Sequence, residues 1–103
     1  MRLSACCLVL MLLVSAGDVT LAADPDNGST LAQRWCSACH VVSGTQTKGT
    51  DIAPSFVSIA EKPDFNVERL AYFLLEPHPK MPNMSLSREE AKNLSAYIAE
   101  QHR

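Results

Sequence analysis

The sequence has no surplus of positive charge. Its 103 residues contain nine Lys and Arg against eleven Asp and Glu, so the formal net charge is −2 at pH 7. Proteins that bind nucleic acids or anionic membranes carry clustered positive charge, because those ligands carry dense negative charge. We therefore expect neither nucleic acid nor an anionic membrane surface among the partners of this chain.

The sequence also lacks an apolar run long enough to cross a membrane, which takes about 20 residues. The apolar run Leu3–Ala16 is shorter. It follows Arg2 and leads through small residues to Ala22, which is the layout of a secretory signal peptide. We predict that residues 1–22 are a cleaved signal peptide and that residues 23–103 form one domain without a permanent membrane anchor. An uncleaved anchor is the alternative.

Cysteine is scarce in the predicted mature chain. Two of the four cysteines, Cys6 and Cys7, fall in the predicted signal peptide, which leaves Cys36 and Cys39. A disulfide between these two would close a very short loop and stabilise the fold little. A domain of about 80 residues is marginal on its apolar core alone. We therefore expect a cofactor to supply part of the core.

No segment shows sustained two-residue alternation, so helices are expected throughout. Spacings of three and four predict a first helix with one apolar face. The residues of this face are Leu31, Ala32, Trp35, Cys36 and Cys39. Asp26 or Asn27 is the expected N-cap. The segment Ser43–Asp51 is rich in Gly, Thr, Gln and Lys, and predicts a flexible surface loop.

Three further segments complete an all-α fold of three to four helices. A short apolar turn is expected after Pro54, and a helix over residues 66–75. Three prolines between residues 77 and 82 then exclude a helix. Ser87 and Glu90 form a capping-box pattern that opens the last helix. Its inward residues are expected to be Ala91, Leu94, Tyr97 and Ile98, and its end to carry His102 and Arg103, favourably placed against its dipole.

The segment Cys36-Ser37-Ala38-Cys39-His40 has the C-x-x-C-H pattern that attaches haem in c-type cytochromes. Two thiols at this spacing can form thioethers with the two vinyl groups on one edge of the porphyrin. The imidazole of the next residue then lies under the ring and can bond the iron. We predict one covalent haem c, with Cys36 and Cys39 as tethers and His40 as proximal iron ligand.

Two other kinds of site share this cysteine spacing. A thioredoxin-type dithiol would need a strand before the motif, in a β-containing fold for which this chain has no pattern. A structural zinc would need further ligands, for which only scattered histidines such as His78 and His102 are available. Haem attachment is the interpretation that the motif favours.

A sixth iron ligand is expected from the loop before the last helix. The candidates are Met81, Met84 and His78. Met81 is favoured because the prolines around it stiffen the loop, and Met/His ligation raises the haem potential. For Met84 the favoured interpretation is packing in the core, the usual role of methionine.

Pro54 is a candidate for orienting the proximal histidine. A metal-bound histidine normally donates its second ring N–H to a fixed acceptor. The carbonyl of Pro54, fourteen residues after His40, is such an acceptor. The alternative is an ordinary proline at the start of a helix.

The mature region resembles the class I (monohaem) cytochrome c family over essentially its whole length. The matching features are Gly28 eight positions before the first cysteine, Cys36–His40, Ala53–Phe56, Lys80–Pro82, and Leu94 with Tyr97 and Ile98. The family often places an aromatic residue four positions before the first cysteine, where this chain has Ala32. Leu31 or Trp35 must then fill that volume.

The resemblance implies a cytochrome c-like bundle in which the first and last helices cross closely. Gly28 would allow this approach, with Leu94 and Tyr97 packed against it. The resemblance also implies Met81 as the distal ligand and the Pro54 carbonyl as the hydrogen-bond partner of the proximal histidine.

The function that follows is electron transfer without bond-making chemistry. We expect a monomer in the bacterial periplasm that takes electrons from a dehydrogenase or bc-type complex and passes them to an oxidase or reductase. Three alternatives remain. They are a haem enzyme or gas sensor with an open iron position, a thiol–disulfide oxidoreductase, and a haem subunit fixed in a larger complex.

Overall fold

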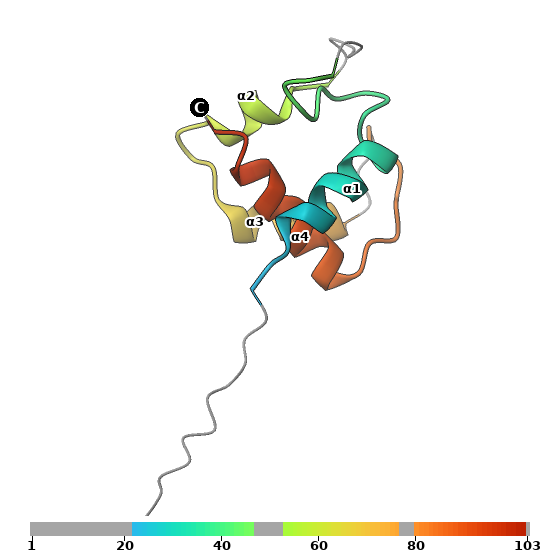
Figure 1. Cartoon of the computed structure of the whole chain (residues 1–103). Helices are drawn as coiled ribbons and strands as arrows, with labels where there is room; N and C mark the ends of the chain where they lie inside the picture. The colour runs from blue at the N-terminus through green and yellow to red at the C-terminus, as the bar shows by residue number, and fades with distance from the viewer. Residues whose placement is uncertain (1–21, 47–52, 77–79, 103) are drawn as a thin grey trace, which may run out of the picture.

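The computed structural model describes residues 22–46, 53–76 and 80–102, which contain helices and, within these ranges, no β-strand (Figure 1). The helices are α1 (Pro25–Trp35), α2 (Phe56–Ala60), α3 (Val67–Leu75) and α4 (Arg88–Ala99). The prediction of a small all-α fold is confirmed. All but the last residue of the predicted signal peptide lies outside the described ranges, so its cleavage stays a prediction. In the described part of the chain, no helix has the length and apolar character that crossing a membrane requires.

Helix α1 begins earlier than the sequence pattern predicted. Its N-cap is Asp24, whose carboxylate accepts hydrogen bonds from the backbone amides of Asp26 and Asn27 at 3.0 and 3.2 Å. The prediction of Asp26 or Asn27 as N-cap was wrong because Pro25 can occupy the first helical position. A proline there has no N–H to leave unpaired, and its fixed φ already suits a helix.

Helices α1 and α4 touch at Gly28. A Cβ atom on this residue would lie 2.1 Å from the carbonyl oxygen of Asn93 and 2.8 Å from the Cβ of Tyr97. No side chain fits at such distances, so glycine is required by the close approach. The nearest atoms to such a Cβ belong to Asn93 and Tyr97, which confirms Tyr97 at this contact, and Leu94 is buried in the core.

Helix α4 is the central element and contacts each of the other three helices (Figure 1). Its capping box is confirmed, since Ser87 and Glu90 each bond the backbone amide of the other at 3.0 and 2.8 Å. The four predicted inward residues are buried: Ala91, Leu94, Tyr97 and Ile98. Two polar residues that the pattern missed, Asn93 and Ser95, are buried as well.

These two polar side chains connect α4 to its neighbours. Asn93 Oδ1 accepts a hydrogen bond from the backbone amide of Asp24 at 2.7 Å, which fixes the start of α1. Ser95 Oγ donates to the Val67 carbonyl oxygen at 2.6 Å, which fixes the start of α3. Buried polar groups are tolerated when they are paired in this way.

The end of α4 differs from the expectation. The helix ends at Ala99 with Glu100 as C-cap, and its last turn carries no basic residue. His102 is exposed and follows the helix, while Arg103 lies outside the described residues. The helix thus ends before both residues, and their favourable placement against its dipole stays a prediction.

The main core cluster joins α1, α2 and α4 with the segment after the cysteine motif. Its members are Ala32, Cys36, Val42, Phe56, Ala60, Leu94, Tyr97 and Ile98. Trp35 and Cys39 do not belong to it, although the helical spacing predicted both as inward; Trp35 is 49% exposed. Helix α1 ends at Trp35, so helical spacing no longer sets the direction of Cys39. Leu31 is buried, but it is not a member of this cluster either.

Candidate functional site

The predicted haem-attachment motif forms a tight turn at the end of α1. Cys36 is the C-cap of the helix, and its carbonyl oxygen accepts hydrogen bonds from the amides of Cys39 and His40 at 3.1 and 2.9 Å. Neither cysteine forms a disulfide. The turn therefore presents two unlinked sulfur atoms and an imidazole within five residues.

The imidazole of His40 is buried and held by one hydrogen bond. Its Nδ1 lies 2.5 Å from the carbonyl oxygen of Pro54. A carbonyl can only accept, so the proton of the neutral ring is on Nδ1 and Nε2 is the nitrogen that can bind a metal. This is the arrangement that metal-binding histidines use to fix their ring orientation. The ring of Phe56 packs beside it, with the ring centroids 5.5 Å apart.

Pro54 is itself fixed by the start of α2. Ser55 caps this helix with its hydroxyl oxygen, which accepts from the Ser58 amide at 3.1 Å. The amide of Phe56 donates to the Val41 carbonyl oxygen at 3.0 Å, so the chain before α2 pairs with the chain after His40. The residues directly after Pro54 are thus held by a helix cap and by one backbone hydrogen bond.

The two cysteines lie in different surroundings. Cys36 is buried, whereas Cys39 is exposed. Burial, and next the nearby Cys39, raise the pKa of the Cys36 thiol to about 11. Such surroundings favour an uncharged sulfur, and a thioether sulfur is uncharged. They do not suit a redox dithiol, whose attacking cysteine needs a lowered pKa.

A zinc site has no support in the described part of the chain. No group of three or more His, Cys, Asp and Glu side chains lies close enough there to hold a metal ion. His102 is exposed beyond α4, and His78 lies outside the described residues.

The two methionines before α4 are both half-buried but lie in different places. Met84 packs against the main core cluster, as its interpretation as a core residue predicted, and Met81 is not part of that packing. The loop after Met81 is shaped by Asn83, whose Oδ1 accepts from the Ser85 amide at 2.9 Å, and by a left-handed φ of 51° at Ser85. The role of Met81 as distal ligand stays a prediction.

Two residues bond the segment after the motif in ways that the sequence pattern did not indicate. Tyr97 Oη donates to the Val42 carbonyl oxygen at 2.6 Å, in the core. Gln46 was expected in a flexible loop, yet it is half-buried and its side-chain amide bonds the backbone around His40. The rest of that expected loop, residues 47–51, lies outside the described ranges.

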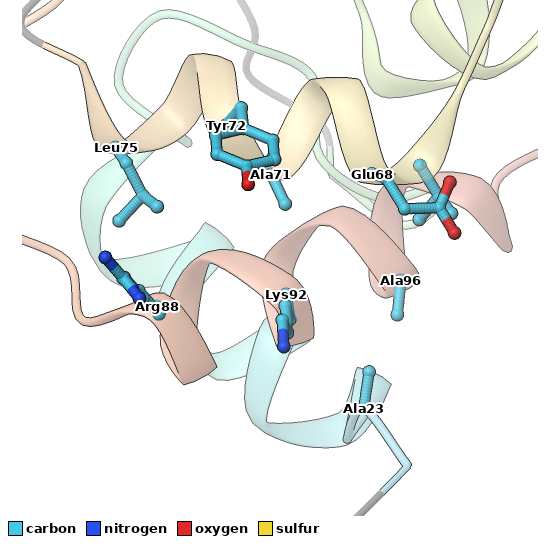
Figure 2. Close-up of a pocket in the computed structure, with 9 residues that line it drawn as sticks. Ala23, Glu68, Ala71, Tyr72, Leu75, Arg88, Lys92 and Ala96 are labelled. Atoms are coloured by element: carbon cyan, nitrogen blue, oxygen red, sulfur yellow. The ribbon is translucent and has the colours of Figure 1, made fainter. Parts of the chain in front are cut away.

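A separate groove of about 490 Å³ lies between α3 and α4. Figure 2 shows Tyr72 and Leu75 on one side of it and Arg88 and Lys92 on the other, with Ala23 near one end. None of the predicted haem residues lines this groove. The candidate haem site is therefore the turn after α1, and its two thiols outside any disulfide and its imidazole with Nε2 available fit haem c.

Comparisons with known proteins identify the family of this chain. The sequence profile of the Cytochrome c family matches residues 25–101. The chain is 50% identical over 98 residues to cytochrome c-552 of Bradyrhizobium diazoefficiens, covering 95% of this chain and 93% of that protein. No solved structure matches the chain. The proteins of this family carry covalent haem c and transfer electrons. On the helical fold and these two matches, the chain belongs to the cytochrome c family and is a haem-containing electron carrier.

Proposed function

We propose that this protein moves single electrons between larger redox proteins, using one haem c held by Cys36, Cys39 and His40, with Met81 as the second axial ligand. The observation that carries the proposal is the hydrogen bond from His40 Nδ1 to the Pro54 carbonyl oxygen, next to two cysteines that form no disulfide. It leaves Nε2 as the iron-binding nitrogen. The haem iron supplies a one-electron couple between the ferrous and ferric states.

The residues of the turn have distinct roles in this proposal. Cys36 and Cys39 anchor the haem edge, one sulfur inside the core and one at the surface. The Pro54 carbonyl fixes the tautomer and the ring direction of His40, and it makes the bound nitrogen more basic. Phe56 covers the imidazole and limits its movement. A ligand fixed in this way keeps its geometry in both oxidation states, so electron transfer requires little rearrangement.

Met81 is proposed as the distal ligand because it follows the proline-rich segment and is half-buried. A thioether opposite an imidazole raises the haem potential. With both axial positions taken by side chains, no position remains for a substrate. This supports a carrier that performs no bond-making chemistry of its own.

We further propose that the protein works in the periplasm as a monomer. The signal-peptide pattern of residues 1–22 supports export, and heme attachment after export requires the two reduced thiols of the motif. The donor would be a dehydrogenase or a bc-type complex, and the acceptor an oxidase or a reductase. With a net charge of −2, the chain carries too little charge for strong long-range steering of either partner.

The ligand assignment is tested by spectra of the matured protein with Met81→Ala and, as matched control, Met84→Ala. We expect the weak near-infrared band of sulfur-to-iron charge transfer in the oxidised parent protein and in Met84→Ala. Met81→Ala should lose it, because its iron has no thioether ligand.

Loss of the band in Met84→Ala alone would mean that Met84, and not Met81, is the distal ligand. A parent protein with high-spin haem and no such band would contradict Met ligation, and would favour a gas-binding or catalytic haem.

A further inference from the structure

The side chain of Gln46 makes three hydrogen bonds to the backbone around the proximal histidine. Its Nε2 donates to the carbonyl oxygens of Ser37 and His40, at 3.2 and 3.0 Å. Its Oε1 accepts from the amide of Val42 at 2.8 Å. One amide group thus connects a residue inside the haem-attachment motif, the predicted iron ligand and the chain that follows it.

The chemistry of these partners fixes which way the amide of Gln46 points. Carbonyl oxygens only accept and a backbone N–H only donates, so Nε2 must face the two carbonyls and Oε1 must face Val42. A primary amide has two N–H donors, and here each serves one carbonyl. A shorter side chain, or one without two donors, cannot make the same set of bonds.

The two carbonyls need these donors because of where α1 ends. The helix stops at Trp35, so the carbonyls of the following turn have no helical amide four residues further on. Among the described residues, no backbone N–H donates to the carbonyl of Ser37 or of His40. Gln46 supplies both missing donors from the next loop.

His40 is consequently held at both ends. Pro54 binds its ring and Gln46 binds its carbonyl. The next anchor along the chain is the hydrogen bond from Tyr97 Oη to the Val42 carbonyl oxygen. Between His40 and Val42, the side chain of Gln46 therefore holds the backbone that sets the direction of the imidazole.

We propose that Gln46 is a positioning residue that sets the orientation of the His40 imidazole over the haem. This inference rests on the proposed function, because it takes His40 as the iron ligand. It adds a residue that acts through the backbone of that ligand and does not touch the iron.

The test uses the matured holoprotein with Gln46→Met and Gln46→Glu. Methionine keeps the length of the side chain and removes all three hydrogen bonds, while glutamate keeps the acceptor and removes both donors. Gln33→Met is the matched control, because Gln33 is exposed on α1 and its Nε2 bonds only the nearby Ser29 hydroxyl, at 3.3 Å.

Two NMR measurements distinguish positioning from simple stabilisation. The first is the pattern of haem-methyl proton shifts in the ferric protein, which reports the direction of the axial imidazole plane. The second is the exchange rate of the Val42 amide. We expect both Gln46 variants to change the methyl pattern and Gln33→Met to leave it as in the parent. In Gln46→Met the Val42 amide should exchange about two- to tenfold faster, as loss of one hydrogen bond implies.

An unchanged methyl pattern in both Gln46 variants would overturn the proposal, even if their stability fell. Failure of both to yield holoprotein while Gln33→Met succeeds would also overturn it, since Gln46 would then serve folding. If the parent protein itself shows no histidine-ligated low-spin haem, the proposed function fails first, and that result is visible before any variant is made.

Discussion

The contact between α1 and α4 and the turn that holds the proposed haem ligand are built in opposite ways. At the first, Gly28 lies so close to Asn93 and Tyr97 that an added Cβ would be 2.1 Å from a carbonyl oxygen. At the second, His40 and Val42 are held by hydrogen bonds with Pro54, Gln46 and Tyr97. The first region is fixed by shape. The second is fixed by polar bonds that give direction, which a metal ligand requires.

The largest loss of stability is expected at the close contact between α1 and α4. Gly28→Ala should lower the free energy of unfolding of the holoprotein by about 3 kcal/mol, because the methyl group must push two helix backbones apart. The measurement is guanidinium unfolding followed by haem absorption.

Gly44→Ala is the matched control for this change. A Cβ at Gly44 meets no atom within 4 Å, and its φ is not positive. The free energy of unfolding of Gly44→Ala should stay within about 0.5 kcal/mol of that of the parent protein. Equal losses in the two variants would mean that the close approach of α1 and α4 does not set the sensitivity of Gly28.

A smaller loss of stability is expected when one hydrogen bond to the turn is removed. Tyr97→Phe keeps the packing of the ring but leaves the Val42 carbonyl without its partner in the core, which should cost about 1–2 kcal/mol. Tyr72→Phe is the control, since Tyr72 is 74% exposed, and it should change stability little. The same unfolding measurement applies.

If Tyr97→Phe were as stable as the parent, the hydrogen bond to Val42 would contribute nothing, and the turn would be held by packing as the helix crossing is. The contrast between the two regions would then disappear.

The sequence predicted the packed region better than the polar one. The spacing of Ala91, Leu94, Tyr97 and Ile98 identified the buried face of α4, because burial there follows directly from helical periodicity. The capping box at Ser87 was predicted equally well, because both of its partners lie within one helical turn. Local patterns of this kind suffice where the interaction is local.

The wrong predictions and the missed residues have other causes. Asp24 was overlooked as N-cap because the helix begins at the proline directly after it, and Cys39 was placed inward because the pattern was continued past the end of α1. Trp35 is the last residue of α1 and is exposed although its spacing fits the apolar face. Gln46 gave no signal at all. Its bonds reach back six and nine residues to carbonyls, and they depend on the path of the loop, which periodicity does not encode.

The central claim is that this chain is an electron carrier whose one haem is fixed at Cys36, Cys39 and His40 and has both axial positions taken. The most direct test is a redox titration of the matured protein, with visible spectra recorded with and without carbon monoxide. The account predicts one covalently bound low-spin haem, one reversible one-electron transition, and a ferrous spectrum that carbon monoxide does not change. Carbon monoxide binding to the ferrous protein, or a matured chain that carries no covalent haem, would contradict it.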